Sequence, residues 1–433
     1  MINVEIRKER TSMELLEKVL DDKNLFEAYK QVYKNRGTSG VDGITVEELG
    51  VYMFKHKEEI KEQIRNRKYK PSPVRRVYIP KENGDKRGLG IPTVVDRLIQ
   101  QAIVQVLSPV YEKQFNETSY GFRPNRSCEM AIIKLLEYFN DGYTWIVDID
   151  LQKFFDTVCH DKLISIIMRT IHDGELVSLI RKYLVSGVME NGVISPTKVG
   201  TPQGGNLSPL LSNIMLNELD KELEKRGLRF ARYADDCIIV VQSEKAANRV
   251  MESITRFIEK KLGLKVNVER SKVTRPNQIK YLGFGFYYTT TGKIKPKPHL
   301  KSIQKFKRKL KQLTKRSWSI SLSERITKLN QVIRGWINYF KIGDMKVKLT
   351  DITSHLSRRI RCTIWKQWKC SKKRIVILIK LGCNKEQAKA IAYSRKSYWN
   401  SSLYISIFIT NKRLKQKGLV FPLDHYLKVH TVI

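Results

Sequence analysis

Two adjacent acids, Asp235 and Asp236, lie where the sequence predicts the turn of a β-hairpin. The flanking runs 228–232 and 237–241 have the apolar, β-branched composition of strands. Asp is tolerated in such turns, but Asp-Gly or Asn-Gly is more usual, and neighbouring carboxylates repel each other. A divalent cation would relieve that repulsion, because hard cations bind carboxylate oxygens. The alternative is a solvated turn that carries two surface acids.

A second pair of acids, Asp148 and Asp150, lies upstream in the run 145–151, which is predicted to be a buried strand. Side chains alternate along a strand, so the two acids share a face. Because a buried unpaired acid is costly, they either form ordinary ion pairs with Lys or Arg or join the hairpin acids in a cluster. Carboxylate clusters hold two Mg²⁺ ions, which activate the attacking oxygen and stabilise the leaving oxygen in phosphoryl transfer.

The run Asp-Leu-Gln-Lys-Phe-Phe-Asp at 150–156, with Tyr-Ala-Asp-Asp at 233–236, resembles the polymerase palm of reverse transcriptases. The residues that this resemblance implies to be catalytic are Asp150, Asp235 and Asp236, and those implied to bind the metal ions are Asp150, Leu151 and Asp235. It also implies that Phe155 would clash with a ribose 2′-hydroxyl and so select deoxynucleotides. From the sequence alone, a core aromatic is an equally good interpretation of Phe155.

Two further segments could bind a nucleotide. Segment 201–209 contains Gly-Gly before Ser-Pro, so its backbone can approach a ligand and then begin a helix. Segment 75–92 is predicted to be a hairpin with an Asn-Gly turn, flanked by Lys81 and Arg87. These two cations could clamp a triphosphate, or they could be solvated turn residues. Both segments are similar to nucleotide-binding parts of reverse transcriptases, which implies nucleotide contacts for Lys81, Arg87 and Gln203.

Segment 115–127 contains Arg123 and Arg126 and is similar to the template-contacting loop of the same enzymes. Both arginines could bind template phosphate, or they could neutralise nearby acids. Further along the chain, the order of motifs implies that Lys272 approaches the triphosphate.

Charge is distributed very unevenly along the 433 residues. Residues 290–433 carry 35 Lys and Arg against five Asp and Glu, whereas residues 1–289 carry 46 against 38. The positive charges of this segment repel one another unless a polyanion binds to them. Nucleic acid is therefore the expected partner, and an anionic membrane surface is the alternative.

Other sequence features exclude several protein classes. No apolar run is long enough to predict a transmembrane helix, and the amino terminus lacks the apolar core of a signal peptide. The six cysteines form no Cys-x-x-Cys pair, so we expect reduced thiols rather than a zinc site.

Hydrophobic periodicity predicts the main helices. They cover residues 13–33, 51–67, 244–262, 301–316, 326–340 and 354–368. Ser243 is the predicted N-cap of the third of these helices. The basic tail also contains aromatic residues, which could stack on unpaired bases or form a small helical core. They are Trp365, Trp368, Tyr393, Tyr398 and Trp399.

The run Arg-Gly-Trp-Ile-Asn-Tyr-Phe at 334–340 resembles the thumb, or maturase domain, of group II intron reverse transcriptases. The resemblance extends over most of the chain and implies an α+β right-hand polymerase. Its parts would be fingers, a palm with an antiparallel sheet, an α-helical thumb and a small basic carboxyl-terminal helical segment that binds DNA. The implied regions are an amino-terminal extension (1–70), fingers and palm (71–288), thumb (289–360) and a basic DNA-binding region (361–433).

The same resemblance implies the function, an RNA-directed DNA polymerase that also acts as a maturase in splicing and mobility of its intron. Its implied partners are group II intron RNA, an RNA template with a DNA primer, target DNA and dNTPs, with two Mg²⁺ ions, in the bacterial cytoplasm. The metal-dependent endonuclease of many relatives is expected to be absent. The alternatives are an RNA-binding splicing cofactor with a vestigial polymerase, and a reverse transcriptase of a retron or diversity-generating element.

Overall fold

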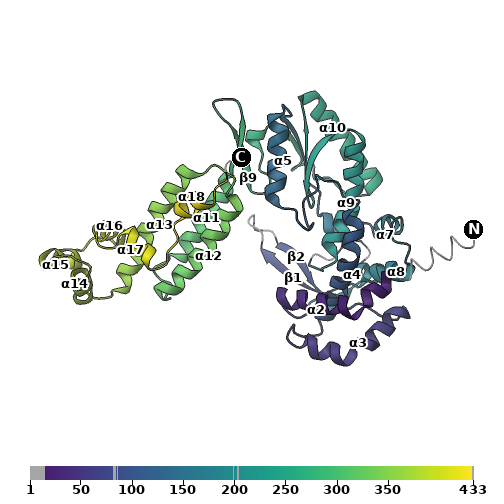
Figure 1. Ribbon diagram of the computed structural model, residues 1–433, viewed down its shortest axis with the longest axis horizontal. Helices are drawn as coiled ribbons and strands as arrows, with labels where there is room; N and C mark the ends of the chain where they lie inside the picture. The colour runs from purple at the N-terminus through teal and green to yellow at the C-terminus, as the bar shows by residue number, and fades with distance from the viewer. Residues whose placement is uncertain (1–14, 81–83, 85, 198, 202–203, 432–433) are drawn as a thin grey trace, which may run out of the picture. The chain divides into compact units, whose positions relative to one another are not determined.

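The computed structural model describes residues 15–431 except 81–83, 85, 198 and 202–203, and it leaves out the side chain of Arg87. The chain divides into two compact units, Met1–Thr274 (unit 1) and Arg275–Ile433 (unit 2), shown in Figure 1. Unit 1 mixes helices with sheets, and unit 2 is mainly helical. The predicted α+β class is therefore confirmed, while the finer division into four regions stays a prediction.

Unit 1 carries all the segments that the sequence linked to chemistry. Its helices are α2 (Asp22–Asn35), α3 (Leu49–Arg65), α4 (Val94–Glu112), α5 (Cys128–Asn140), α6 (Phe154–Thr157), α7 (His160–Met168), α8 (Gly174–Val185), α9 (Ser208–Lys225), α10 (Glu244–Phe257) and the π-helical turn η1 (Ile258–Leu262). Its strands are β1 (Val74–Pro80), β2 (Lys86–Ile91), β3 (Trp145–Ile149), β4 (Val188–Glu190), β5 (Val193–Ser195), β6 (Arg229–Tyr233), β7 (Asp236–Val241) and β8 (Lys272–Thr274).

The first sheet of unit 1 has the strand order β6-β7-β3-β8, with every neighbouring pair antiparallel. Strand β7 lies inside the sheet and is buried along almost its whole length, as its run of Ile and Val predicts. This is the antiparallel sheet expected from the acidic segments. It brings β3 and the β6–β7 hairpin together, although many residues separate them in the sequence.

The second sheet has the order β2-β1-β4-β5. Strands β1 and β2 form the predicted hairpin, in which Ile79 lies opposite Arg87. Strand β4 joins β1 in parallel, with Val74 opposite Val188. The short hairpin β4–β5 thus extends the sheet that the sequence predicted as an isolated pair of strands.

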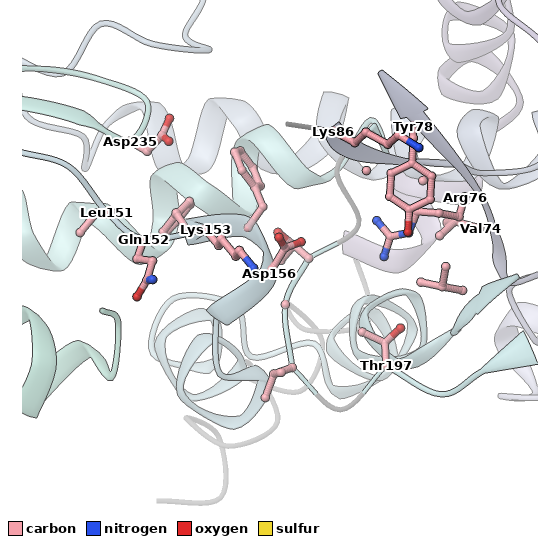
Figure 2. A pocket seen from close by; sticks show the side chains of 18 of the residues that line it. Val74, Arg76, Tyr78, Lys86, Leu151, Gln152, Lys153, Asp156, Thr197 and Asp235 are labelled. Carbon is pink, nitrogen blue, oxygen red and sulfur yellow. The ribbon is translucent and has the colours of Figure 1, made fainter. Parts of the chain in front are cut away.

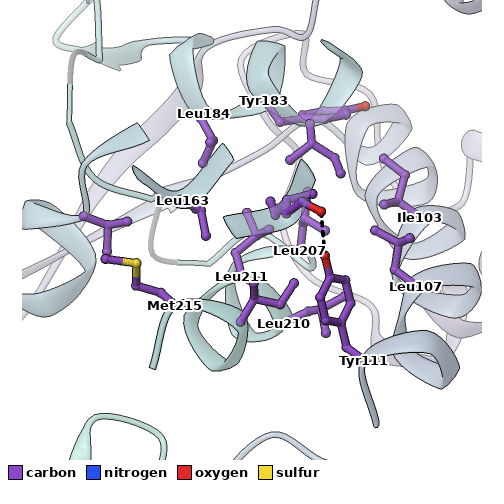
Figure 3. Packing of buried hydrophobic residues seen from close by; sticks show 14 of the residues in the cluster. Ile103, Leu107, Tyr111, Leu163, Tyr183, Leu184, Leu207, Leu210, Leu211 and Met215 are labelled. Atoms are coloured by element: carbon purple, nitrogen blue, oxygen red, sulfur yellow. Dashed lines mark hydrogen bonds between the residues drawn. The ribbon is translucent and has the colours of Figure 1, made fainter. Parts of the chain in front are cut away.

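The core of unit 1 lies between α4, α7, α8 and α9. Figure 3 shows apolar side chains of these helices packed together, with the Tyr111 hydroxyl donating to the Ile167 carbonyl at 3.4 Å. Helix α9 begins at Ser208 with Pro at its second position, as the Ser-Pro signal predicted. This core also supports the first sheet, because Phe230, Val147 and Ile239 of its strands belong to the same cluster.

Unit 2 contains a hairpin and a set of helices. The hairpin is formed by β9 (Phe284–Tyr288) and β10 (Ile294–Pro298), after the 3₁₀ turn η2 (Pro276–Gln278). The helices are α11 (Leu300–Leu313), α12 (Leu322–Phe340), α13 (Lys346–Gln367), α14 (Ser371–Lys380), α15 (Lys385–Tyr393), α16 (Tyr398–Tyr404), α17 (Asn411–Gln416) and α18 (Pro422–Val429). Helix α18 folds back on α12 and α13, and the buried Tyr426 hydroxyl donates to the Gly343 carbonyl at 3.1 Å.

Most aromatic residues of the basic tail contact the chain's own arginines. Arg358 lies 3.9 Å from the Trp399 ring, Arg316 lies 4.6 Å from the Tyr398 ring, and Trp365 is buried. Cation–π contacts of this kind stabilise a folded helical unit. They favour the helical-core interpretation for Trp365 and Tyr398, whereas Trp399 and Tyr393 are exposed.

The helix predicted for 354–368 begins earlier, at Lys346, and the one predicted for 326–340 begins at Leu322. Two other helix predictions were wrong in their continuity. The segment 13–33 is interrupted at Asp21, whose carboxylate accepts hydrogen bonds from the Lys23 and Asn24 amides and so begins α2. The segment 244–262 starts correctly at the Ser243 cap, but it changes from an α-helix to a π turn after Phe257. All six cysteines are free thiols, and no helix in the described part of the chain is both long and apolar enough to cross a membrane.

Candidate active site

The acidic hairpin has a turn of only two residues. Tyr233 at the end of β6 pairs with Asp236 at the start of β7, so Ala234 and Asp235 alone lie between the strands. Ala234 has a φ of +57°, in the left-handed region that residues other than Gly seldom adopt. Each strand therefore runs one residue closer to the turn than the sequence predicted, and Asp235 is the acid at its tip.

Asp150 emerges from the sheet beside this hairpin. Ile149, the last residue of β3, lies opposite Cys237 on β7. The next residue along β3 is Asp150, and the next residue back along β7 is Asp236, so the two segments meet at the same end of the sheet. Antiparallel pairing has brought together acids that the sequence only suggested were neighbours.

The segment 265–271 fixes the backbone of Asp150. The Asn267 amide donates to the Asp150 carbonyl at 2.8 Å, and the Asp150 amide donates to Ser271 Oγ at 3.1 Å. From the same segment, Arg270 places a guanidinium nitrogen 3.9 Å from the Asp150 carboxylate. These contacts define both the position and the electrostatic surroundings of the carboxylate.

Asp150 and Asp235 line one cavity of about 1040 Å³. Figure 2 shows Asp235 and Leu151 toward one end of this cavity and Arg76 and Lys86 toward the other. Ligand pockets commonly measure about 300–1,000 Å³, so the cavity has room for a ligand of nucleotide size. Asp236 is exposed and is not among the described residues that line it.

The described lining residues include charges of both signs. The acids are Asp150, Asp156, Glu190 and Asp235, and the bases are Arg76, Lys86, Lys153 and Arg270. A ligand that combines anionic phosphates with divalent cations has the matching pair of charges, because phosphates bind to Arg and Lys and cations bind to carboxylates.

Asp148 lies two residues before Asp150 and opposite Lys272 on β8. Burial raises the pKa of the Asp148 carboxyl to about 6, an effect that the Lys272 ammonium opposes and the Asp150 charge reinforces. The Lys272 charge therefore favours the Asp148 carboxylate without outweighing its burial. Burial of this kind strengthens electrostatic interactions at the strand end.

The donor atoms suit a divalent cation. Asp150, Asp235 and the Leu151 backbone all offer hard oxygens at the same cavity. Among the described residues no group of three or more His, Cys, Asp or Glu side chains forms a complete metal cage. Mg²⁺ does not need one, because it is usually bound by one or two carboxylates together with substrate phosphates and water. The residues therefore fit Mg²⁺ held jointly by protein and substrate.

The predicted nucleotide contacts are described only in part. Phe155 in α6 is half-buried, lines the cavity and packs edge-on against Phe154 with 5.2 Å between the ring centroids. Lys81 and Gln203 lie outside the described residues. Arg87 is described in its backbone alone, in β2.

Two cations of the second sheet that line the cavity, Arg76 and Lys86, were not predicted as site residues from the sequence. The cavity-facing residues of β1 are Val74, Arg76 and Tyr78, which alternate along the strand. The Arg76 guanidinium lies against Gly88 of β2, where an added Cβ would come within 2.8 Å of Arg76 Nη1. Because side chains alternate along a strand, the sequence of β1 could have predicted that Arg76 shares a face with Val74 and Tyr78. The prediction relied instead on the charge near the turn, at Lys81.

The two arginines of segment 115–127 neutralise acids of the same region. Arg123 binds Glu112 at 2.6 Å and also donates to the Ser119 carbonyl at 2.8 Å, and Arg126 pairs with Glu117. Arg123 is buried, so its guanidinium is committed to the fold. The contacts favour neutralisation over template binding for Arg123.

Comparison with known proteins decides the family. A family model described as reverse transcriptase (RNA-dependent DNA polymerase) matches residues 79–286, and one described as group II intron, maturase-specific domain matches residues 303–379. Protein YkfC of Escherichia coli (strain K12) is 33% identical over 303 residues, which cover 61% of this chain and 80% of YkfC. The group II intron-encoded protein LtrA of Lactococcus lactis is 33% identical over 334 residues, which cover 62% of this chain and 55% of LtrA.

The chain belongs to the group II intron-encoded reverse transcriptases. Its RNA-directed DNA polymerase domain lies in unit 1 and the start of unit 2, and its maturase domain lies in unit 2. Reverse transcriptases use divalent metal ions and act on nucleic acids, which agrees with the acids and bases that line the cavity of this member. The match spans about half the length of LtrA.

A solved structure, a partial Cas6-RT-Cas1–Cas2 complex, matches at a TM-score of 0.37 and 23% identity, covering 57% of this chain and 42% of that chain.

Proposed function

We propose that the cavity of unit 1 is where this reverse transcriptase extends a DNA primer on an RNA template. One observation carries the proposal: Asp150 and Asp235, from distant segments, line the same cavity as the half-buried ring of Phe155. Phosphoryl transfer needs little covalent chemistry from a protein, so positioning and electrostatics supply most of the catalysis. The cavity offers oxygen donors toward one end and cations toward the other.

Five of the lining residues have a defined role in metal or phosphate binding in this proposal. Asp150, Asp235 and the Leu151 carbonyl hold two Mg²⁺ ions, with Asp236 as the third acid of the site. Bound Mg²⁺ lowers the pKa of the attacking hydroxyl and neutralises charge on the leaving oxygen. Arg76 and Lys86 bind phosphate oxygens of the incoming dNTP and hold it for in-line attack by the primer 3′-hydroxyl.

The remaining contacts select the nucleotide. In this proposal the ring of Phe155, which lines the cavity, excludes a ribose 2′-hydroxyl, so that the enzyme takes deoxynucleotides. Family likeness adds Lys81 and Arg87 as triphosphate ligands and Gln203 as a contact to the incoming nucleotide. These roles extend the basic end of the cavity that Arg76 and Lys86 define.

We also propose that unit 2 binds group II intron RNA, and target DNA during mobility, in the bacterial cytoplasm. The match to the maturase-specific domain and the large excess of cations after residue 289 support this role. A maturase needs no chemistry of its own, because tighter binding to the folded intron is enough to favour splicing. The same match favours an intron-encoded enzyme over one from a retron or diversity-generating element.

Primer extension on an RNA template tests the polymerase role. Asp235→Asn should lower the rate by more than about 100-fold, since losing a metal ligand costs at least as much as losing its outer-shell partners. Asp141→Asn is the matched control, because Asp141 forms an exposed ion pair with Arg229 at 2.8 Å and neither residue is among the described residues that line the cavity. Equal synthesis by Asp235→Asn and wild type would refute the proposal.

The splicing role is measured with the same proteins. If Asp235→Asn still promotes intron splicing, the polymerase and maturase roles use different surfaces. A wild-type protein that promotes splicing but cannot extend a primer would instead support the splicing cofactor with a vestigial polymerase.

A further inference from the structure

Arg232 has a fully buried guanidinium next to the acidic turn, and the proposed mechanism does not use it. The residue lies on β6, one position before Tyr233, and its side chain is inaccessible to solvent. Its Nε and Nη2 donate to the two carboxylate oxygens of Asp220, at 2.7 and 2.5 Å. A buried pair of this kind gains little net stability over apolar packing, so stability alone does not account for it.

The rest of the guanidinium connects helix α9 to the turn. Nη1 of Arg232 donates to Asn213 Oδ1 at 3.1 Å and to the carbonyl oxygen of Ala234 at 2.9 Å. Asn213 and Asp220 are two helical turns apart on α9, so both face the same side of that helix. One planar group therefore fixes the Ala234 carbonyl relative to a buried helix.

The turn needs this support because its conformation is unfavourable. Ala234 adopts a φ of +57°, although the first central residue of a turn with positive φ is usually Gly. Gly121 packs against the turn so closely that an added Cβ would lie 2.2 Å from the Ala234 amide nitrogen. Asn213 also fixes Gly121, because its side-chain amide donates to the Gly121 carbonyl at 2.8 Å.

The Ala234 carbonyl belongs to the same peptide unit as the Asp235 amide. Because a peptide unit is planar, fixing its oxygen also fixes the nitrogen from which Asp235 begins. We propose that Arg232 is a positioning residue that aims the Asp235 carboxylate into the cavity through its hydrogen bond to the Ala234 carbonyl. This inference rests on the proposed function, in which Asp235 is a metal ligand.

The test measures metal-dependent assembly without chemistry. Full-length protein is mixed with an RNA template, a dideoxy-terminated DNA primer and the next dNTP, and stable ternary complex is measured against Mn²⁺ concentration. Arg232→Lys keeps the charge but loses the planar fork, so the Mn²⁺ midpoint should rise about 10- to 100-fold, as for other outer-shell partners of metal ligands. Thermal melting of each protein is followed in parallel.

Arg123→Lys is the matched control. Arg123 is also a buried guanidinium of unit 1, but its hydrogen bonds within the described chain go to Glu112 and to the Asn116 and Ser119 carbonyls, not to the 233–236 turn. It should lower the melting temperature while leaving the Mn²⁺ midpoint unchanged. Asn213→Ala removes one anchor of the Arg232 guanidinium and the hydrogen bond to the Gly121 carbonyl but retains the Asp220 pair, and it should shift the midpoint in the same direction by less.

The outcomes separate this inference from the proposed function. If Asp235→Asn forms the complex with the wild-type Mn²⁺ midpoint, Asp235 is no metal ligand and the proposed function fails. If Asp235→Asn loses the Mn²⁺ response while folded Arg232→Lys and Asn213→Ala both behave like Arg123→Lys, the positioning role is overturned and the proposed function stands. If Arg232→Lys does not fold, the Mn²⁺ midpoint of Asn213→Ala alone tests the positioning role.

Discussion

At the scale of single residues, Arg76 offers the sharpest test of the basic end of the cavity. Its guanidinium lies on the cavity side of β1, against Gly88 of β2. Arg76→Ala should raise the KM for dNTP about 10- to 100-fold with little change in kcat, because a charge-assisted hydrogen bond contributes about 1.5–3 kcal/mol and binds substrate and transition state alike. Steady-state primer extension measures both constants.

The neighbouring Arg75 supplies the control for this prediction. Arg75 is on the same strand, but its guanidinium donates to the Ser39 carbonyl at 2.7 Å, and it is not among the described residues that line the cavity. Arg75→Ala should reduce stability and leave the KM unchanged. An unchanged KM for Arg76→Ala would show that Arg76 does not contact the triphosphate.

Phe155 is predicted to control the choice of sugar. Replacing its ring by the smaller side chain in Phe155→Val opens space beside the nucleotide, so discrimination against ribonucleotides should fall about 10- to 100-fold, the range of one steric contact of about 1–3 kcal/mol. The ratio of kcat/KM for dCTP and rCTP measures this. Phe139 of α5 provides a comparison, because it is buried and is not among the described residues that line the cavity: Phe139→Leu should lower the melting temperature without changing the ratio.

The sequence was sufficient to predict that Asp150 and Asp235 lie together, as they do at one cavity, but it did not predict the residues that support them. Those acids stand out because carboxylates interrupt apolar strands, a signal that is local in the sequence. The support given by Arg232 depends on Asn213 and Asp220 of another helix, and no local pattern contains that contact. Residues that act through tertiary contacts were therefore missed, while residues that break a local pattern were found.

At the scale of elements, periodicity located the helices well and their ends less well. The break at Asp21 and the π turn after Phe257 both follow from backbone hydrogen bonding, to which the apolar pattern is insensitive. Strands shorter than four residues, such as β4 and β8, are too brief to show a period of two. They were found only because the structure pairs them with longer strands.

Helix α18 leads to a prediction about stability. Tyr426 is buried and is the donor to the Gly343 carbonyl, so Tyr426→Phe should lower the free energy of unfolding by about 1–2 kcal/mol. Urea denaturation followed by tryptophan fluorescence reports on this unit, because five of the six tryptophans lie between residues 318 and 399. The Tyr393→Phe control should change nothing, since Tyr393 is 64% exposed. Equal losses for both variants would contradict the docking role of α18.

At the scale of the whole molecule, the positive charge belongs almost entirely to one part of the chain. The excess of Lys and Arg begins near residue 290, so it falls within unit 2 and leaves unit 1 close to neutral. Composition alone predicted this asymmetry, since charge counting needs no knowledge of the fold. Affinity for nucleic acid should accordingly depend on unit 2, and nucleotide selection on unit 1.

Salt dependence tests that division in the full-length protein. If unit 2 contacts six to ten phosphates, affinity for intron RNA should fall about 10³- to 10⁵-fold between 50 and 200 mM salt. Lys307 and Lys311 of α11 line a basic concavity together with Arg359 of α13. Replacing both lysines with Gln should reduce the slope of log affinity against log salt by about 0.7–0.9 for each phosphate that the variant no longer binds. Lys134→Gln is the control, because Lys134 already pairs with Glu137 in unit 1, and an equal change in slope for this variant would refute the assignment of RNA binding to unit 2.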